Sequence, residues 1–140
     1  MRQITKEDLE KALQILSQLS HSGGDKDTDK LRDVLDAILK DSNYYLNVCE
    51  DNGNVIGTSM LYIQHNLSHE GRPRGHIENV VVDRNYRSRG IGRLLLDDLL
   101  RRAKERDCYK VILHCRPENI GFYEKSCFRK TGEVEMRVDL

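Results

Sequence analysis

The residues of this chain best suited to chemistry form a short basic turn with two glycines, Arg87-Ser88-Arg89-Gly90-Ile91-Gly92-Arg93. Three consecutive valines shortly before the turn favour an extended backbone, and the leucines that begin at Leu94 recur on one face of a helix. The first amides of a helix have no intrahelical acceptor and attract anions, and glycine lets an anion approach the backbone closely. A helix that begins near Gly90 would therefore offer a binding site for a diphosphate, and the arginines would add positive charge.

Two familiar glycine-rich phosphate loops do not match this spacing. A P-loop needs Lys followed by Ser or Thr after its glycines, and a dinucleotide-binding turn needs the order G-x-G-x-x-G. A solvated basic turn between a strand and a helix remains the simpler alternative. The order found here, Arg-x-x-Gly-x-Gly, resembles the Q/R-x-x-G-x-G/A motif of the GNAT acetyltransferases, whose backbone amides hold the diphosphate of coenzyme A.

The first half of the chain predicts two helices followed by a strand pair. Helical spacing of apolar residues begins at a capping-box pattern and runs to about Leu19, and Thr28 is placed to cap a second helix. Strands are expected at residues 44–50 and 55–64, and the Asn-Gly turn between them makes the pair antiparallel.

The second half predicts a strand on each side of the long helix. The elements expected there are, in order, a polar loop at residues 66–75, a strand at 76–82, a helix at 90–106, a strand at 111–113, a short helix that opens at Pro117 and a last strand at 134–138. Because a single helix separates the strands at 76–82 and 111–113, we expect a crossover between parallel strands.

Length and composition favour one globular α/β domain over residues 1–140. The chain has 38% hydrophobic residues, 33% charged residues and a formal net charge of zero. Apart from a local basic cluster at residues 84–93, it lacks the overall positive charge typical of nucleic-acid binding, so a small phosphorylated ligand fits better. No apolar run approaches the roughly 20 residues that span a membrane, and the N-terminus lacks the apolar core of a signal peptide. We expect a soluble protein of the cytoplasm or another reducing compartment.

The four cysteines, Cys49, Cys108, Cys115 and Cys127, include no C-x-x-C pair and no histidine at a zinc-binding spacing. We therefore expect reduced, mostly buried thiols and no bound metal.

A wider resemblance to one acetyltransferase family extends beyond the glycine turn. The segments at residues 76–82, 108–115 and 119–125 are similar to the eukaryotic glucosamine 6-phosphate N-acetyltransferases. The resemblance implies a GNAT fold, with a mixed central sheet of antiparallel N-terminal strands and a parallel strand pair, flanked by helices. It also implies acetyl-CoA as cosubstrate, an amino-sugar phosphate as acceptor in the pathway to UDP-N-acetylglucosamine, and a homodimer with shared active sites.

The same resemblance assigns acetyl-CoA to a strand edge, the basic turn and the short helix near residue 120. The residues concerned are Val80, Val82, Arg87, Ser88, Arg89, Gly90, Ile91, Gly92, Arg93, Asn119, Tyr123 and Lys125. The amide near Val80 could stabilise the oxyanion of the tetrahedral intermediate. The Tyr123 hydroxyl could protonate the departing thiolate, although an aromatic residue beside Phe122 is also typical of a core.

The amino-sugar phosphate is assigned, again by resemblance, to Ser20, Asn66, His69, Glu78, Asn79, Tyr109, Lys110 and Arg137. The resemblance leaves open whether the Asn66 loop comes from the same chain or from the partner subunit. Glu78 lies in an apolar strand whose alternation does not decide which way the carboxylate points. It could assist a water molecule in removing the ammonium proton before attack. Lys110 could supply a point charge for the phosphate, or could be an ordinary solvated lysine.

The chain departs from the family pattern at three positions. His114 stands where the family usually has a carboxylate, so either its main-chain carbonyl is what matters or its imidazole replaces the acid as a base. Cys127 stands where the family has glycine. Asp139 occupies the position of a C-terminal arginine, for which Arg137 could substitute.

Two other functions fit part of this pattern. An acetyltransferase for a protein lysine, a protein N-terminus or a polyamine would keep the basic turn but have no use for phosphate contacts at Tyr109 and Lys110. A non-catalytic sensor of acyl-CoA would bind the thioester and acetylate no amine.

Overall fold

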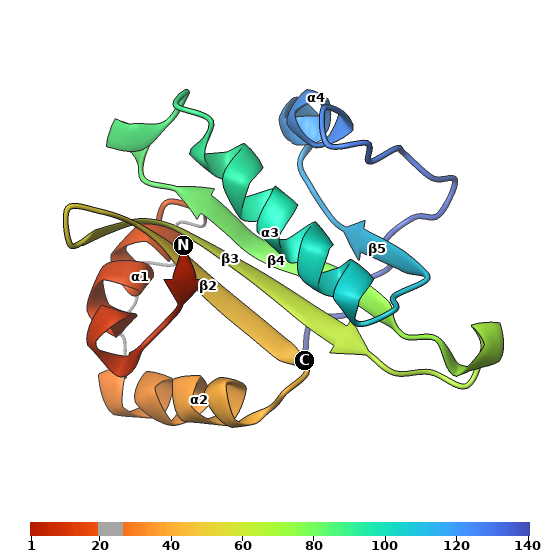
Figure 1. Ribbon diagram of the computed structural model, residues 1–140, viewed down its shortest axis with the longest axis horizontal. Helices are drawn as coiled ribbons and strands as arrows, with labels where there is room; N and C mark the ends of the chain where they lie inside the picture. Colours follow the sequence, from red (N-terminus) through yellow and green to blue (C-terminus); the bar gives the residue numbers. More distant parts are fainter. Residues whose placement is uncertain (20–26) are drawn as a thin grey trace.

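A computed structural model describes residues 1–19 and 27–140, and its centre is a five-stranded mixed sheet (Figure 1). The strand order follows the chain: β1 (Arg2–Gln3), β2 (Tyr44–Asp51), β3 (Asn54–Gln64), β4 (Arg74–Val82) and β5 (Lys110–Leu113). The first four strands are antiparallel, whereas β4 and β5 are parallel. Both the hairpin and the crossover expected from the sequence are confirmed.

Helices cover both faces of this sheet. They are α1 (Leu9–Leu16), α2 (Thr28–Lys40), α3 (Ile91–Glu105) and α4 (Ile120–Glu124), with a 3-10 turn at Pro117–Asn119 before α4. Val48, which pairs with Thr58, packs with α1 and α2, whereas Leu61 packs with α3. Since residues 58 and 61 of one strand point to opposite faces, α3 covers one side and α1 and α2 the other. The expected α/β architecture is therefore confirmed, with one core on each face of the sheet.

Two details of the helices differ from the sequence-based expectation. The α-helix that begins at Leu9 ends at Leu16, and turns rather than α-helix continue to Leu19. Thr28 is not the cap of the second helix but its first residue, and the cap is Asp27, whose carboxylate accepts a hydrogen bond from the Lys30 amide at 3.0 Å. The reason is geometric, because a capping side chain must come from the residue just before the first helical one.

The expected last strand at residues 134–138 is absent from the structure. Val134, Met136 and Val138 alternate with charged residues as in a strand, yet they are 79%, 87% and 78% exposed. Alternation creates one apolar face, but a strand forms only where a neighbour completes its hydrogen bonds. No strand within the described residues pairs with this segment.

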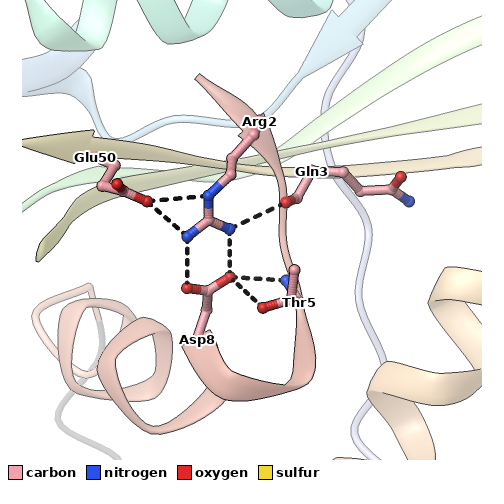
Figure 2. Close-up of polar contacts among 5 residues, drawn as sticks. All are labelled: Arg2, Gln3, Thr5, Asp8 and Glu50. Atoms are coloured by element: carbon pink, nitrogen blue, oxygen red, sulfur yellow. Dashed lines mark hydrogen bonds and ion pairs between the residues drawn. The ribbon is translucent and has the colours of Figure 1, made fainter. Parts of the chain in front are cut away.

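The N-terminal strand is tied to the rest of the fold by Arg2. Figure 2 shows its guanidinium between two carboxylates, with two hydrogen bonds to Asp8 at 2.6 and 2.9 Å and contacts to Glu50 of β2 at 2.7 and 3.0 Å. The Asp8 carboxylate also accepts hydrogen bonds from the amide and hydroxyl of Thr5, at 2.7 and 3.0 Å. The hydrogen bonds from Arg2, followed by those from Thr5, lower the pKa of Asp8 from an ordinary value of 3.8 to about 2.

We expect Asp8→Asn to destabilise the protein by about 1 to 2 kcal/mol at neutral pH, because solvent reaches Arg2 and weakens the pair. The folded state holds the Asp8 proton less tightly than the unfolded state does. The contribution of the Asp8 carboxylate to the free energy of unfolding is therefore complete above pH 4, and it is lost as the pH falls from about 3.8 towards 2. Urea unfolding of wild type and variant between pH 7 and pH 3 measures the difference.

Asp29→Asn is the control for this experiment, because Asp29 also forms an ion pair with an arginine, Arg32, but its side chain is almost fully exposed. We expect that change to stay within about 0.5 kcal/mol. A difference between Asp8→Asn and wild type that did not shrink on acidification would contradict the role given to the carboxylate.

Candidate active site

A cleft of about 880 Å³ opens where β4 and β5 part from one another. The two strands pair only from Arg74 to Ile77 on β4 and from Lys110 to Leu113 on β5. Beyond these residues β4 continues to Val82, whereas the chain leaves β5 for the turn that leads into α4. The cleft brings together most of the residues expected to bind acetyl-CoA, all three expected to be catalytic, and Asn79, which was assigned to the amino-sugar phosphate. These residues are Glu78, Asn79, Val80, Val82, Arg87, Ser88, Gly90, Ile91, Gly92, Arg93, His114, Asn119, Tyr123 and Lys125.

Gly90 and Gly92 serve different purposes in the turn. Gly90 precedes α3 with a φ of +79°, which favours glycine, and a Cβ built on it meets nothing within 4 Å. A Cβ on Gly92 would lie 3.0 Å from the Phe122 ring. The first glycine therefore leaves open space at the helix start, whereas the second lets α3 pack against α4.

The start of α3 presents backbone donors to the cleft. Leu94 donates the first hydrogen bond of the helix, to the Gly90 carbonyl at 3.1 Å. The amides of Ile91, Gly92 and Arg93 precede that bond and have no acceptor within the helix. Together with the open space at Gly90, they form a cradle suited to an anion.

The arginine side chains of the turn make more contacts within the protein than the sequence suggests. Arg87 donates from Nε to the Val82 carbonyl at 3.1 Å, and Arg93 donates to the Asp97 carboxylate and to the carbonyl of Lys125. Arg89 lies over the Tyr86 ring at 5.1 Å and is not among the residues that line the cleft. These side chains hold the turn in place as well as contributing positive charge.

A β-bulge places the edge of β4 for binding. Thr58 pairs with Val81 and Met60 with Glu78, so Asn79 and Val80 together face Ser59. Asn79 adopts a φ of +55°, and the bulge turns two successive side chains, Glu78 and Asn79, outward. It also removes Val80 from the regular ladder with β3, so that its backbone lies along the cleft wall.

Tyr123 of α4 is enclosed by aromatic rings on the far side of the cleft. Its ring centroid lies 5.0 Å from that of Phe122 and 6.0 Å from that of Phe128, both edge-on. Burial, followed by the nearby thiol of Cys115, raises the pKa of Tyr123 above its usual value. The hydroxyl therefore stays protonated at neutral pH and can donate a proton.

Glu78 points outward and not into the core, which settles the orientation that the sequence left open. Its side chain is 53% exposed, and one carboxylate oxygen lies 3.8 Å from Nε2 of His76. The His76 ring in turn meets the His114 ring edge-on, with centroids 5.5 Å apart. Glu78, His76 and His114 thus form a row across β4 and the end of β5.

Four other residues assigned to the sugar phosphate, Asn66, His69, Tyr109 and Lys110, do not line the cleft. Tyr109 stacks on His69 with ring centroids 3.9 Å apart, and the Lys110 ammonium is 5.4 Å from the Tyr109 ring centre. The Asn66 side chain donates to the carbonyl of Arg72 at 3.0 Å. These groups gather where β4 and β5 begin, whereas the cleft lies where the strands part.

Two assigned residues belong to neither of these groups. Arg137 lies in the exposed C-terminal segment and forms an ion pair with Asp139 at 2.8 Å. Ser20 falls outside the described residues.

The cleft also includes residues that the sequence did not single out. Gln18, Cys115, Arg116 and Phe122 all line it. The expectation of mostly buried thiols is wrong, because Cys115 and Cys127 are exposed and Cys49 and Cys108 are only half-buried. Apolar surroundings do raise the pKa of Cys108. The position of Cys115 just past the end of β5 was the available signal, since loops after strands commonly carry site residues.

Within residues 1–19 and 27–140, no group of three His, Cys, Asp or Glu side chains is arranged to hold a metal ion. In the same part of the chain, no helix has the length and apolar character needed to cross a bilayer.

Comparison with known proteins agrees with this architecture. The model of the acetyltransferase (GNAT) family matches residues 9–127. The chain belongs to this family. The GNAT fold expected from the sequence is therefore confirmed, and the cleft beside the Gly90 turn lies within the matched region.

Relatives of known name are found among the amino-sugar acetyltransferases. The chain is 48% identical over 84 residues to the glucosamine 6-phosphate N-acetyltransferase of Candida albicans, a match that covers 60% of this chain and 56% of that protein. It is 44% identical over 88 residues to the protein of the same name from Trypanosoma brucei brucei, covering 63% and 59%. The match therefore spans less than two thirds of the length of either relative.

A solved structure shows the same similarity in three dimensions. The glucosamine-6-phosphate N-acetyltransferase from Arabidopsis thaliana superposes with a TM-score of 0.89 at 27% sequence identity. The superposition covers 98% of this GNAT chain and 95% of the Arabidopsis chain.

Proposed function

We propose that this chain is a single GNAT domain that transfers the acetyl group of acetyl-CoA to the amine of D-glucosamine 6-phosphate, giving N-acetyl-D-glucosamine 6-phosphate and CoA. This product feeds the synthesis of UDP-N-acetylglucosamine. The observation that carries the proposal is the cleft itself, which places helix-start amides, the outward carboxylate of Glu78 and the protonated Tyr123 around one space. The names of its relatives in Candida albicans and Trypanosoma brucei brucei supply the substrate.

Acetyl-CoA fits the residues present. The open space at Gly90 and the amides of Ile91, Gly92 and Arg93, which have no acceptor within the helix, suit a diphosphate. The bulged edge of β4 offers the backbone of Val80 and Val82 to the amide-rich pantetheine arm. Asn119 and Lys125 line the opposite wall.

The reaction in this proposal is a direct transfer without a covalent enzyme intermediate. The amine nitrogen forms a bond to the thioester carbon, and the Val80 amide stabilises the oxyanion that develops. The carbon–sulfur bond then breaks, and Tyr123 donates its proton to the departing sulfur. The attacking nitrogen loses one proton as it becomes an amide, and that proton restores the Tyr123 hydroxyl. Glu78 helps a water molecule to accept the ammonium proton, so that the amine attacks in its neutral form.

The phosphate end of the sugar is assigned to the group at the beginning of β4 and β5. Lys110 there supplies a positive charge, and the stacked pair of His69 and Tyr109 forms a flat wall beside it. This group is separate from the cleft in one chain, which supports a site completed by a second subunit.

We extend the proposal to a cytoplasmic homodimer. Val134, Met136 and Val138 present an exposed apolar row that a single chain does not cover, and such a row is typical of an interface. Sedimentation of the purified protein tests this part, and a monomer at micromolar concentration would contradict it.

A thiol-release assay tests the reaction. We expect CoA thiol to appear with acetyl-CoA and glucosamine 6-phosphate, and much less with glucosamine, which lacks the phosphate, or glucose 6-phosphate, which lacks the amine. Faster release with a lysine peptide or a polyamine would favour a different GNAT acceptor. Binding of acetyl-CoA without release for any amine would favour a sensor.

His114→Asn tests the main departure from the family pattern. We expect near-native turnover and an unchanged acid limb in the pH profile, because the variant keeps the main-chain carbonyl and the imidazole of His114 packs against that of His76. The measurement is kcat/KM against pH at saturating acetyl-CoA. If the imidazole were the base, turnover would fall about 10²-fold or more and an ionisation near neutral pH would disappear.

A further inference from the structure

Gln18, in the turn after α1, contacts the chain that leads from β4 to the basic turn. Its side-chain oxygen accepts a hydrogen bond from the Arg84 amide at 3.0 Å and a weaker one from an Arg87 guanidinium nitrogen at 3.5 Å. Arg84 and Arg87 belong to the loop that leads from β4 into the basic turn. One amide oxygen therefore joins the end of the first helix to the approach of the diphosphate cradle.

Arg87 also contacts the end of β4. Its Nε donates to the carbonyl of Val82, the last residue of β4, at 3.1 Å. The guanidinium thus lies between Gln18 on one side and the end of the strand on the other. If the Gln18 oxygen is removed, the Arg84 amide loses its acceptor and Arg87 loses one of its two fixed points.

A second link holds the same loop from the same helix. Lys11 of α1 lies 3.8 Å from the buried carboxylate of Asp83, which accepts a hydrogen bond from the Asn85 amide at 3.0 Å. The Asp83 amide donates to the carbonyl of Ile56 at 2.8 Å. Because Asp83 anchors the first part of the loop independently, loss of the Gln18 contact should loosen the part nearer the turn and leave the fold intact.

The chemistry of glutamine suits this position. A carboxylate could accept the same two hydrogen bonds, but it would place a negative charge on the wall of a cleft built for a diphosphate. Glutamine supplies an acceptor without charge, and its amide nitrogen adds a donor beside the cleft.

We propose that Gln18 is a positioning residue that fixes the Arg84 to Arg87 approach so that the helix-start amides point at the diphosphate of acetyl-CoA. This inference rests on the proposed use of acetyl-CoA. It does not depend on which amine is acetylated. Gln18 acts through the turn and touches no reacting atom.

The test compares acetyl-CoA with S-acetylpantetheine, which carries the same thioester and arm but no diphosphate. We expect Gln18→Met, which keeps the length and removes the acceptor, to raise the KM for acetyl-CoA about tenfold. The kcat with acetyl-CoA and the KM for S-acetylpantetheine should change less than twofold. A general structural defect would affect both thioesters alike, and that result would overturn the proposal, as would an unchanged KM for acetyl-CoA.

Two further variants sharpen the experiment. Gln14→Met is the matched control, since Gln14 is an exposed glutamine of α1, four residues before Gln18, and does not line the cleft. Gln18→Glu keeps the acceptor and adds a charge, so its affinity for acetyl-CoA should fall furthest below that of wild type at low salt, and this difference should narrow as salt is raised. If Gln18→Met did not fold, a difference between Gln18→Glu and wild type that did not change with salt would still overturn the proposal.

Calorimetry separates this inference from the proposed reaction. Titration of CoA and pantetheine into wild type and Gln18→Met requires no acceptor amine. Weaker binding of CoA alone in the variant would support the role of Gln18 even if glucosamine 6-phosphate were not acetylated, and equal binding of CoA would contradict it.

Discussion

Replacing Tyr123 by phenylalanine is expected to lower kcat about 10²- to 10⁴-fold while acetyl-CoA affinity and stability stay close to wild type. The phenol is the protonated group that faces the cleft from α4, and burial keeps its pKa above the usual value. Without it, the sulfur must leave as an unassisted thiolate. The aromatic contacts with Phe122 and Phe128 survive the substitution, so the local packing should not change.

Single-turnover kinetics at saturating acetyl-CoA measure this effect directly. Tyr44→Phe is the control, because Tyr44 of β2 loses the same hydroxyl while its ring remains beside Tyr62, 4.7 Å away and outside the cleft. We expect the control to turn over normally. Native turnover in Tyr123→Phe would leave Tyr123 as a packing residue and remove the acid from the proposed mechanism.

Local patterns in the sequence were sufficient to predict the elements that build the cleft. The valines before the basic turn and the leucines after it predicted the strand, the turn and α3. The crossover rule predicted that β5 is parallel to β4. These signals work because each depends on neighbours within a few residues. The resemblance to GNAT enzymes then placed residues such as Tyr123 opposite the turn, which no local pattern could do.

The sequence was less informative wherever a contact joins distant segments. The bulge at Asn79 depends on its pairing with β3, and the Gln18 contact with Arg84 spans 66 positions. The apolar alternation of residues 134–138 predicts a strand, but it does not say which strand would pair with this segment, and the structure forms no strand there. In each case the missing information is the identity of a partner, which propensity does not contain.

The different roles of Gly90 and Gly92 could be recognised only from the structure. From the sequence, both Gly90 and Gly92 admit an anion to the backbone. In the fold only Gly90 has open space and a positive φ, because Phe122 occupies the position beside Gly92. Substitutions at the two positions should therefore fail for different reasons, the first through binding and the second through packing of α4 on α3.

Gly90→Val is accordingly expected to raise the KM for acetyl-CoA by about 10²-fold or more, since the new side chain would fill the cradle and strain a backbone held at a φ of +79°. Strain alone should cost about 1 to 2 kcal/mol of stability. Gly53→Val separates the two effects, because Gly53 lies in the β2–β3 turn with a φ of +80° and equally open surroundings, but away from the cleft. We expect both variants to lose similar stability on thermal unfolding and only Gly90→Val to lose acetyl-CoA affinity in calorimetry. Unaltered affinity in Gly90→Val would mean that the helix-start amides do not hold the diphosphate, whereas equal losses in both variants would trace the effect to the fold.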